Sequence, residues 1–100
     1  MKLTHLLVRL SIVSIAAALT LPAYAAEGGA IYKAKCAMCH GAEGQGKIGP
    51  ALKGTSLTAD QISDLLTKGN DARKAPHKKP IAGLSADDAK SVADFVKGMK

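Results

Sequence analysis

The chain has 100 residues, a formal charge of +6 and 47% hydrophobic residues. This length accommodates one domain and excludes a large multidomain enzyme, and the hydrophobic fraction is too high for a disordered tail. Aromatic residues make up only 3%, a small supply for a chain whose size already limits how much apolar surface it can bury. Two cysteines allow one disulfide at most, which excludes a disulfide-dense scaffold. The composition suggests that something other than side chains fills part of the core.

Residues 1–25 have the pattern of a secretory signal peptide. Lys2 and Arg9 supply positive charge, Leu10–Leu21 is an apolar run, and Ala23-Tyr24-Ala25 places small residues where signal peptidase reads them. A retained membrane anchor is the alternative, because the 17 uncharged residues from Leu10 reach the lower limit of a spanning segment. We expect cleavage after Ala25 or Ala26, export to the periplasm and no stable membrane insertion.

Cleavage leaves a single domain over residues 26–100. It removes two basic residues and lowers the formal charge to +4, with Tyr32 and Phe95 as the remaining aromatics. A domain of about 75 residues usually needs a disulfide, a metal or another cofactor for stability. In an extracytoplasmic compartment paired thiols tend to be oxidised, unless a cofactor captures them.

The mature part predicts helices and loops, because no alternating run of strand length occurs in it. Apolar residues at helical spacing predict a first helix over about Gly28–Lys35. The segment Gly41–Gly54 contains five glycines, which exclude a regular helix and indicate a loop wrapped closely around something.

A second helix is predicted from Thr58, where Gln61 three residues later completes a capping box. Its stop is expected at Gly69. A second loop follows over Asn70–Leu84 and contains two prolines.

The last helix is expected to begin at Ser85 and end at Gly98. Asp87 and Asp88 lie in its first turn, where the helix dipole favours carboxylates. Its apolar residues recur at i, i+3, i+4 and i+7. Three short helices bury too little apolar surface to order the chain alone, so both loops are expected to line a flat apolar ligand.

The reactive segment is Cys36-Ala37-Met38-Cys39-His40. C-x-x-C-H is the attachment motif of c-type haem. The two thiols, on one helical turn, bond the two vinyl groups, and the imidazole that follows lies under the iron. We therefore expect one covalent haem c, attached through Cys36 and Cys39, with His40 as the proximal iron ligand.

Two other sites use the same residue types. A thiol–disulfide oxidoreductase also contains C-x-x-C, but it needs a strand–helix scaffold that the sequence does not predict. A zinc site of Cys36, Cys39, His40 and His77 would have a suitable donor set. However, a histidine directly after the second cysteine does not fit the usual ligand spacing, and haem attachment is favoured over both alternatives.

With this motif, the mature chain resembles the small class I c-type cytochromes of bacterial periplasms over essentially its whole length. Gly28 and Tyr32 match the pattern of the family's N-terminal helix, and Phe95 matches the aromatic of its last helix. The resemblance implies an all-α fold, a small cytochrome c of about three short helices with long loops wrapped around one covalently bound haem. It also implies that the terminal helices cross closely at Gly28.

The segment Gly49-Pro50-Ala51-Leu52 resembles the family's G-P-x-L. The resemblance implies that the Pro50 carbonyl accepts a hydrogen bond from Nδ1–H of His40, which fixes the ring and raises its basicity. It also implies that Leu52 packs on the haem.

The second loop departs from the family, which usually places a methionine there as the sixth iron ligand. The mature methionines are Met38, inside the motif, and Met99, at the chain end. His77 is the preferred replacement, because imidazole is neutral near pH 7 whereas a lysine must first lose a proton. Lys78 and Lys79 are the alternatives. Because Met/His ligation raises the haem potential, we expect a lower potential here.

Five basic residues lie in or beside the second loop: Lys68, Arg73, Lys74, Lys78 and Lys79. In the family this loop borders the exposed haem edge, so the basic group is expected to attract an acidic redox partner; a surface that only maintains solubility is the alternative. Nucleic acid is not expected, because aromatic residues do not interleave with the basic ones. The function expected is a soluble periplasmic electron carrier and not an enzyme. A haem protein that binds a small gas is the alternative.

Overall fold

The computed structural model describes residues 23–100. Over this range the chain forms helices α2 (Ala23–Lys35), α3 (Ala37–His40), α4 (Ala59–Lys68) and α5 (Ala86–Lys97), and it contains no strand. The all-α fold expected from the sequence is confirmed. No helix in this range has the length and apolar character needed to cross a membrane.

Helix α2 begins at Ala23, about five residues before the start expected from the sequence. Its first four residues, Ala-Tyr-Ala-Ala, include three alanines, and alanine is the strongest helix former. The helical spacing of apolar residues starts later, which explains why it indicated Gly28. The signal peptide expected over residues 1–25 lies outside the described residues, except for the three residues that begin α2.

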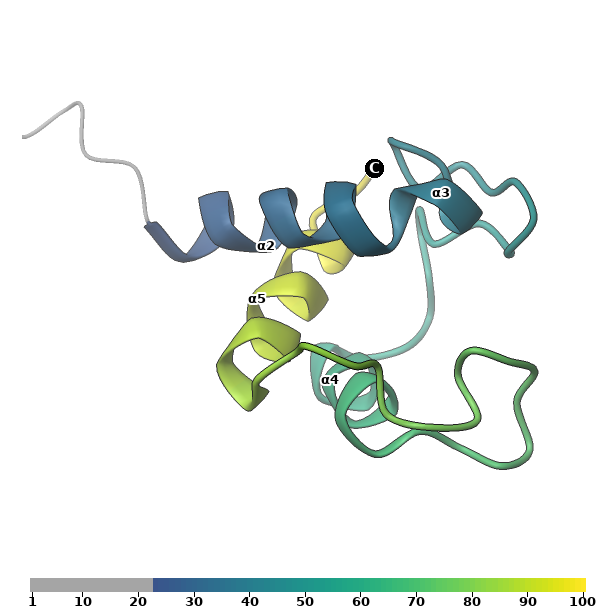
Figure 1. Cartoon of the computed structure of the whole chain (residues 1–100). Helices are drawn as coiled ribbons and strands as arrows, with labels where there is room; N and C mark the ends of the chain where they lie inside the picture. Colours follow the sequence, from purple (N-terminus) through teal and green to yellow (C-terminus); the bar gives the residue numbers. More distant parts are fainter. Residues whose placement is uncertain (1–22) are drawn as a thin grey trace, which may run out of the picture.

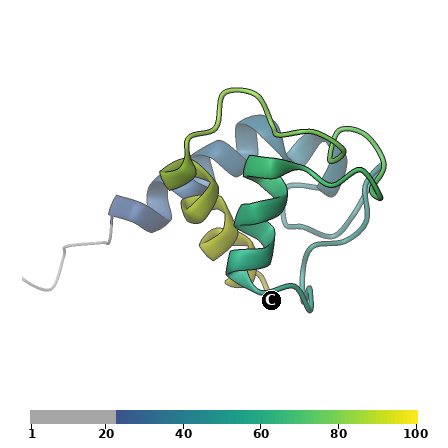
Figure 2. The same ribbon diagram turned by 90° about the horizontal axis from the view of Figure 1, so that it is seen from below.

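Helix α5 lies between α2 and α4 and packs against both (Figure 1 and Figure 2). It crosses α2 at Gly28, where an added Cβ would overlap the main-chain carbonyl of Ser91. One turn further along α2, the ring of Tyr32 lies 5.4 Å from that of Phe95, at an interplanar angle of 45°. The close crossing therefore depends on a glycine, and an aromatic pair lies beside it.

The buried apolar core is small. It contains one residue of α2, two of α4 and four of α5: Tyr32, Ile62, Leu66, Ala89, Val92, Ala93 and Val96. Most of these side chains are small or β-branched, so the helices alone enclose little apolar volume. The Tyr32 hydroxyl donates a hydrogen bond of 2.7 Å to the Gly41 carbonyl, which ties this core to the chain just after α3.

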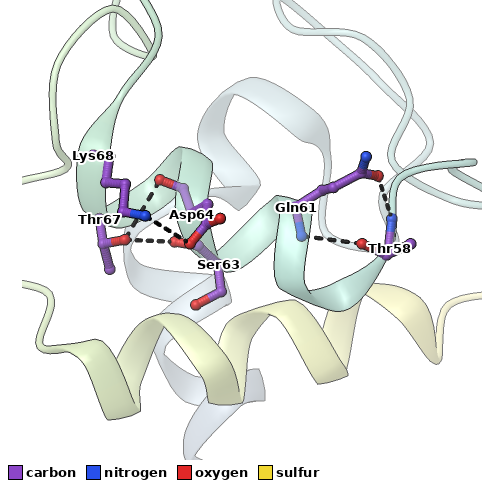
Figure 3. Close-up of polar contacts among 6 residues, drawn as sticks. All are labelled: Thr58, Gln61, Ser63, Asp64, Thr67 and Lys68. Atoms are coloured by element: carbon purple, nitrogen blue, oxygen red, sulfur yellow. Dashed lines mark hydrogen bonds and ion pairs between the residues drawn. The ribbon is translucent and has the colours of Figure 1, made fainter.

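Helix α4 begins with the capping box expected from the sequence. The Thr58 amide donates to Oε1 of Gln61 at 2.9 Å, and the Gln61 amide donates to Oγ1 of Thr58 at 3.1 Å (Figure 3). On its solvent side, Lys68 and Asp64 form an exposed ion pair of 3.5 Å. Helix α5 has a second capping box, formed by Ser85 and Asp88. These caps fix where the helices start and therefore where the loops end.

Two long segments without regular structure connect the helices. We call residues 41–58, between α3 and α4, the first loop, and residues 69–85, between α4 and α5, the second loop. Both extend to the same side of the helices in the two views (Figure 1 and Figure 2). They enclose the region in which the reactive residues lie.

Candidate metal centre

The C-x-x-C-H segment forms a tight turn that continues α2 into α3. The Cys36 carbonyl accepts hydrogen bonds from the amides of Cys39, at 3.2 Å, and His40, at 3.0 Å. Both cysteines are half-buried and not joined by a disulfide, whereas the Met38 side chain between them is 79% exposed. The turn therefore separates the two thiols from the methionine.

Burial raises the pKa of the Cys36 thiol above its ordinary value, although neighbouring Lys35 opposes the shift and Cys39 adds to it. A thiol with a raised pKa is mostly protonated near neutral pH and reacts poorly as a free nucleophile. This is the reverse of what a thiol–disulfide oxidoreductase needs at its attacking cysteine. The local electrostatics therefore weigh against that alternative.

The ring of His40 is buried and fixed from the first loop. Its Nδ1 donates a hydrogen bond of 2.7 Å to the Pro50 carbonyl, as the resemblance to the cytochrome family implied. Gly49 packs directly on the ring: an added Cβ would lie 2.8 Å from Cε1 of His40. The Gly49 amide also donates to the Cys39 carbonyl at 2.7 Å. Since Nδ1 is occupied, Nε2 is the nitrogen left free to bind a metal.

His77 of the second loop faces His40 although 37 positions separate them in the chain. Their ring centres are 6.0 Å apart and their planes differ by 34°. Two imidazoles that bind one metal ion from opposite sides, with bonds of about 2 Å, have ring centres about 6 Å apart. The observed separation is compatible with two ligands on one ion.

The imidazole of His77 is half-buried, and its Nδ1 has no hydrogen-bond partner among the described residues. Burial lowers the pKa of His77, and the nearby His40 and Arg73 lower it further. The ring is therefore neutral near pH 7, the form that binds metals. A buried nitrogen without a partner is costly, and a metal ion supplies what such a nitrogen lacks.

Hydrogen bonds within the second loop hold the main chain of His77. Its amide donates to the Lys74 carbonyl at 3.0 Å, and its carbonyl accepts from the Asn70 amide at 2.8 Å. The alternative ligands Lys78 and Lys79 are both exposed. Of the three candidates for the sixth ligand, His77 is the one that the structure brings opposite His40.

Two cavities meet at this pair of histidines and share His40, Pro50, Arg73 and His77 in their walls. The inner cavity, of about 110 Å³, is lined mainly by apolar side chains of the loops, α4 and α5, including Leu52. The outer cavity, of about 510 Å³, reaches Cys39 and opens between residues 48–50 and 72–77. Cys36 borders the inner cavity and Cys39 the outer one.

These features fit a c-type haem. An apolar recess continuous with a more open one suits a flat cofactor that has an apolar and a polar edge, and the two thiols border the same recess. Two opposed imidazoles suit an octahedral iron whose other four ligands come from the cofactor. Among the residues described, no three His, Cys, Asp or Glu side chains gather closely enough to hold a metal ion by themselves. The zinc arrangement considered from the sequence is therefore not formed.

Arg73 is the member of this site that the sequence did not indicate. It was expected only as part of a basic surface, yet it contributes to the walls of both cavities. No motif marks it, because its position depends on how the second loop folds back over α4. Gly49 was recognised as part of G-P-x-L, but its contact with the imidazole follows only from the structure.

Comparison with known proteins supports the same cofactor. Residues 23–96 match the family model described as cytochrome C oxidase, cbb3-type, subunit III. Cytochrome c-551 of Stutzerimonas stutzeri is 31% identical over 87 residues, which cover 79% of this chain and 83% of that protein. Cytochrome c-550 of Bacillus subtilis (strain 168) is 34% identical over 70 residues, which cover 70% of this chain and 55% of that protein. The chain thus spans about half the length of the latter relative. No solved structure gives a significant match.

Proposed function

The chain belongs to the c-type cytochrome family that its residues 23–96 match, and we propose that it is a one-haem electron carrier whose iron is held between His40 and His77. The observation that carries this proposal is the 6.0 Å separation of the two imidazoles beside the C-x-x-C-H turn. When bound, the haem supplies reversible one-electron chemistry at iron. The protein attaches the haem, orients it and excludes water, and no substrate chemistry is assigned to it.

Each site residue has a separate task in this proposal. Cys36 and Cys39 provide the sulfurs for covalent attachment, and Nε2 of His40 provides the proximal ligand. The Pro50 carbonyl, 2.7 Å from Nδ1 of His40, holds the ring orientation and makes the imidazole a stronger donor. Leu52 forms part of the apolar wall and shields the haem from water.

In this proposal the sixth ligand is His77, because both methionines of residues 23–100 have other positions. Met38 is exposed on the turn, and the Met99 sulfur packs beside Gly44 of the first loop. Nitrogen ligation on both sides lacks the thioether that raises the potential of Met/His cytochromes. We therefore expect a lower potential than in Met-ligated relatives, with the low-spin spectrum of a six-coordinate iron.

Spectra of the purified holoprotein test this ligation. The wild type is expected to be low-spin in both redox states, to lack the charge-transfer band of an iron–methionine bond, and to change little with carbon monoxide. His77→Ala should become high-spin and bind carbon monoxide rapidly. The variants Lys78→Ala and Lys79→Ala are matched controls and should remain low-spin. An iron–methionine band in the wild type, or an unchanged spectrum in His77→Ala, would disprove the ligand assignment.

Carbon monoxide also separates the proposal from the second function considered, a haem protein that binds a small gas. Such a protein needs an open or labile sixth position. The half-buried His77, opposite His40 and held by two main-chain hydrogen bonds, supports a closed position instead. Rapid binding of carbon monoxide by the wild type would favour the gas-binding function.

The partner is proposed to be an acidic redox protein that docks on the second loop. Lys74, Lys78 and Lys79 are exposed there, as is Arg73, whereas Lys68 already pairs with Asp64 on α4. Surface charges of one sign accelerate association with an oppositely charged partner, and salt screens this effect. The rate of electron transfer to an acidic acceptor should therefore fall steeply with ionic strength, and a rate independent of salt would contradict this docking surface.

We also propose that residues 1–25 direct export to the periplasm and are then removed. The charged start, apolar run and small residues before position 26 support this. Attachment of haem to C-x-x-C-H would then take place outside the cytoplasm. Mass spectrometry of the native protein would show whether the chain begins at Ala26 or Glu27.

A further inference from the structure

Arg73 has a position that no other basic residue of the second loop shares. Arg73 lines the inner and the outer cavity beside the two histidines. It also lines a third cavity of about 290 Å³, which shares Leu57 and Leu65 with the inner cavity. This third cavity is more polar, with Gln61 and Asn70 in its wall. Arg73 therefore lies where the apolar recess for the cofactor meets a polar one.

The guanidinium of Arg73 is available for a ligand. No residue in the range 23–100 forms a hydrogen bond or an ion pair with this side chain, although its main-chain amide is bonded to the Asn70 carbonyl at 2.9 Å. The same positive charge acts on His77 across the site, where it helps to lower the pKa of that imidazole. The main chain of Arg73 is held in place, and its guanidinium, without a partner among residues 23–100, lies beside an apolar recess. Such a cation is suited to binding an anion from within that recess.

The cofactor brings such an anion. A c-type haem has an apolar edge, which its thioether bonds attach near Cys36 and Cys39, and a polar edge with two propionate carboxylates. Arginine binds carboxylates through two parallel N–H groups and keeps its charge at all physiological pH values. A carboxylate that enters a partly apolar recess needs a partner of this kind.

On the premise of the haem site proposed above, we propose that Arg73 is the residue that binds a propionate carboxylate of the haem, at the junction of the three cavities. The guanidinium then orients the polar edge of the cofactor and offsets the charge of the carboxylate. A positive charge close to the iron disfavours the oxidised, more positive state by Coulomb repulsion. Arg73 therefore also raises the potential of a haem whose two imidazole ligands keep it low.

The neighbouring lysines do not have this geometry. Lys74 lines the outer cavity alone, and Lys68 lines the third cavity alone, where it pairs with Asp64 at 3.5 Å. Lys78 and Lys79 line none of the three cavities. Lys74 is therefore a matched control, because it adjoins Arg73 in the chain, carries the same charge and is also exposed.

Resonance Raman spectra and potentiometry of the holoprotein test the proposal. The propionate bending band of the haem should shift in Arg73→Gln and keep its position in Lys74→Gln. The reduction potential should fall in Arg73→Gln by more than in Lys74→Gln. Arg73→Lys retains the charge without the two-pronged geometry, so it should restore most of the potential while its propionate band remains shifted.

The outcomes also separate this inference from the proposed function. An unshifted propionate band in Arg73→Gln, in a protein with the normal low-spin haem spectrum, overturns the role of Arg73 and leaves the haem site intact. Equal shifts in the two glutamine variants overturn it as well. If Arg73→Gln accumulates without haem, the propionate bending band of Arg73→Lys replaces it as the test. A shifted band supports the role of Arg73, and an unshifted band overturns it. A wild type without a c-type haem spectrum would contradict the proposed function itself.

Discussion

The two loops hold the two histidines in different ways. The first loop is bonded to the turn that carries His40: the His40 carbonyl accepts from the Gly46 amide at 2.7 Å, and the Cys39 carbonyl accepts from the Gly49 amide at 2.7 Å. Together with the bond from Nδ1 to Pro50, these contacts join residues at most ten positions apart. The proximal side of the site is therefore determined within one short stretch of chain.

The second loop carries His77 by contacts with itself and with α4. Residues 71–76 are all exposed, and the loop returns to the helices where the Ile81 amide donates to the Leu66 carbonyl at 2.9 Å. At its start, Gly69 lies against the main chain of Lys78 and Lys79. The position of His77, the proposed distal ligand, therefore depends on how a long loop closes on one end of α4. This difference predicts that the distal side is the easier one to disturb.

The largest effect is expected from Gly69→Ala. Gly69 has φ 71° and ψ 178°, a region essentially restricted to glycine. An added Cβ would also lie 2.5 Å from the carbonyl carbon of Lys79. Strain and overlap each cost about 1–3 kcal/mol, so the free energy of unfolding should fall by about 2 kcal/mol or more. Because the overlap lies two residues from His77, a high-spin fraction should appear in the oxidised spectrum.

Gly54→Ala is the matched control for that variant. Gly54 also has a positive φ, of 75°, but an added Cβ there would meet no atom within 4 Å. It should lose stability through strain alone and remain fully low-spin. If Gly69→Ala also remained fully low-spin, closure of the second loop on α4 would not be what positions His77, and the contrast between the loops would be wrong.

Most of the fold follows from local patterns. The capping box at Thr58, the stop at Gly69 and the start at Ser85 were predicted, because each depends on side chains within one helical turn. The start of α2 was not, since alanine residues extend the helix beyond the segment in which apolar spacing is visible. Close approaches were predicted only where the family resemblance supplied them, as at Gly28.

In the site, too, features that depend on nearby residues were predicted, and features that depend on tertiary structure were not. His40 was expected from the contiguous C-x-x-C-H motif. Its bond to Pro50 was implied by the family resemblance, and the bond is present. The sequence favoured His77 over Lys78 and Lys79 but did not exclude the two lysines. Which of three consecutive side chains faces the site depends on how the loop folds. Arg73 was assigned to the surface, since a residue that joins several cavities cannot be recognised from its neighbours in the chain. The sixth ligand and the position of Arg73 therefore could not be predicted from the sequence, because both depend on the tertiary structure.

A smaller effect is expected from Gly49→Ala, which tests the proximal side. Gly49 has no positive φ, so the substitution introduces overlap without backbone strain: the added Cβ would lie 2.8 Å from Cε1 and 3.0 Å from Nδ1 of His40. Moving the ring should lengthen its bond to Pro50 and cost about 1–3 kcal/mol of folding free energy. A weaker bond at Nδ1 makes the imidazole a poorer electron-pair donor to the iron.

The haem of Gly49→Ala should nevertheless stay attached and low-spin, because Cys36 and Cys39 flank the same turn and restrict how far His40 can move. Denaturant unfolding and an NMR signal for Nδ1–H of His40 would measure both effects, with Gly54→Ala as the control. A high-spin fraction larger than that of Gly69→Ala would show that the proximal loop, and not the distal one, is the weaker holder of its ligand.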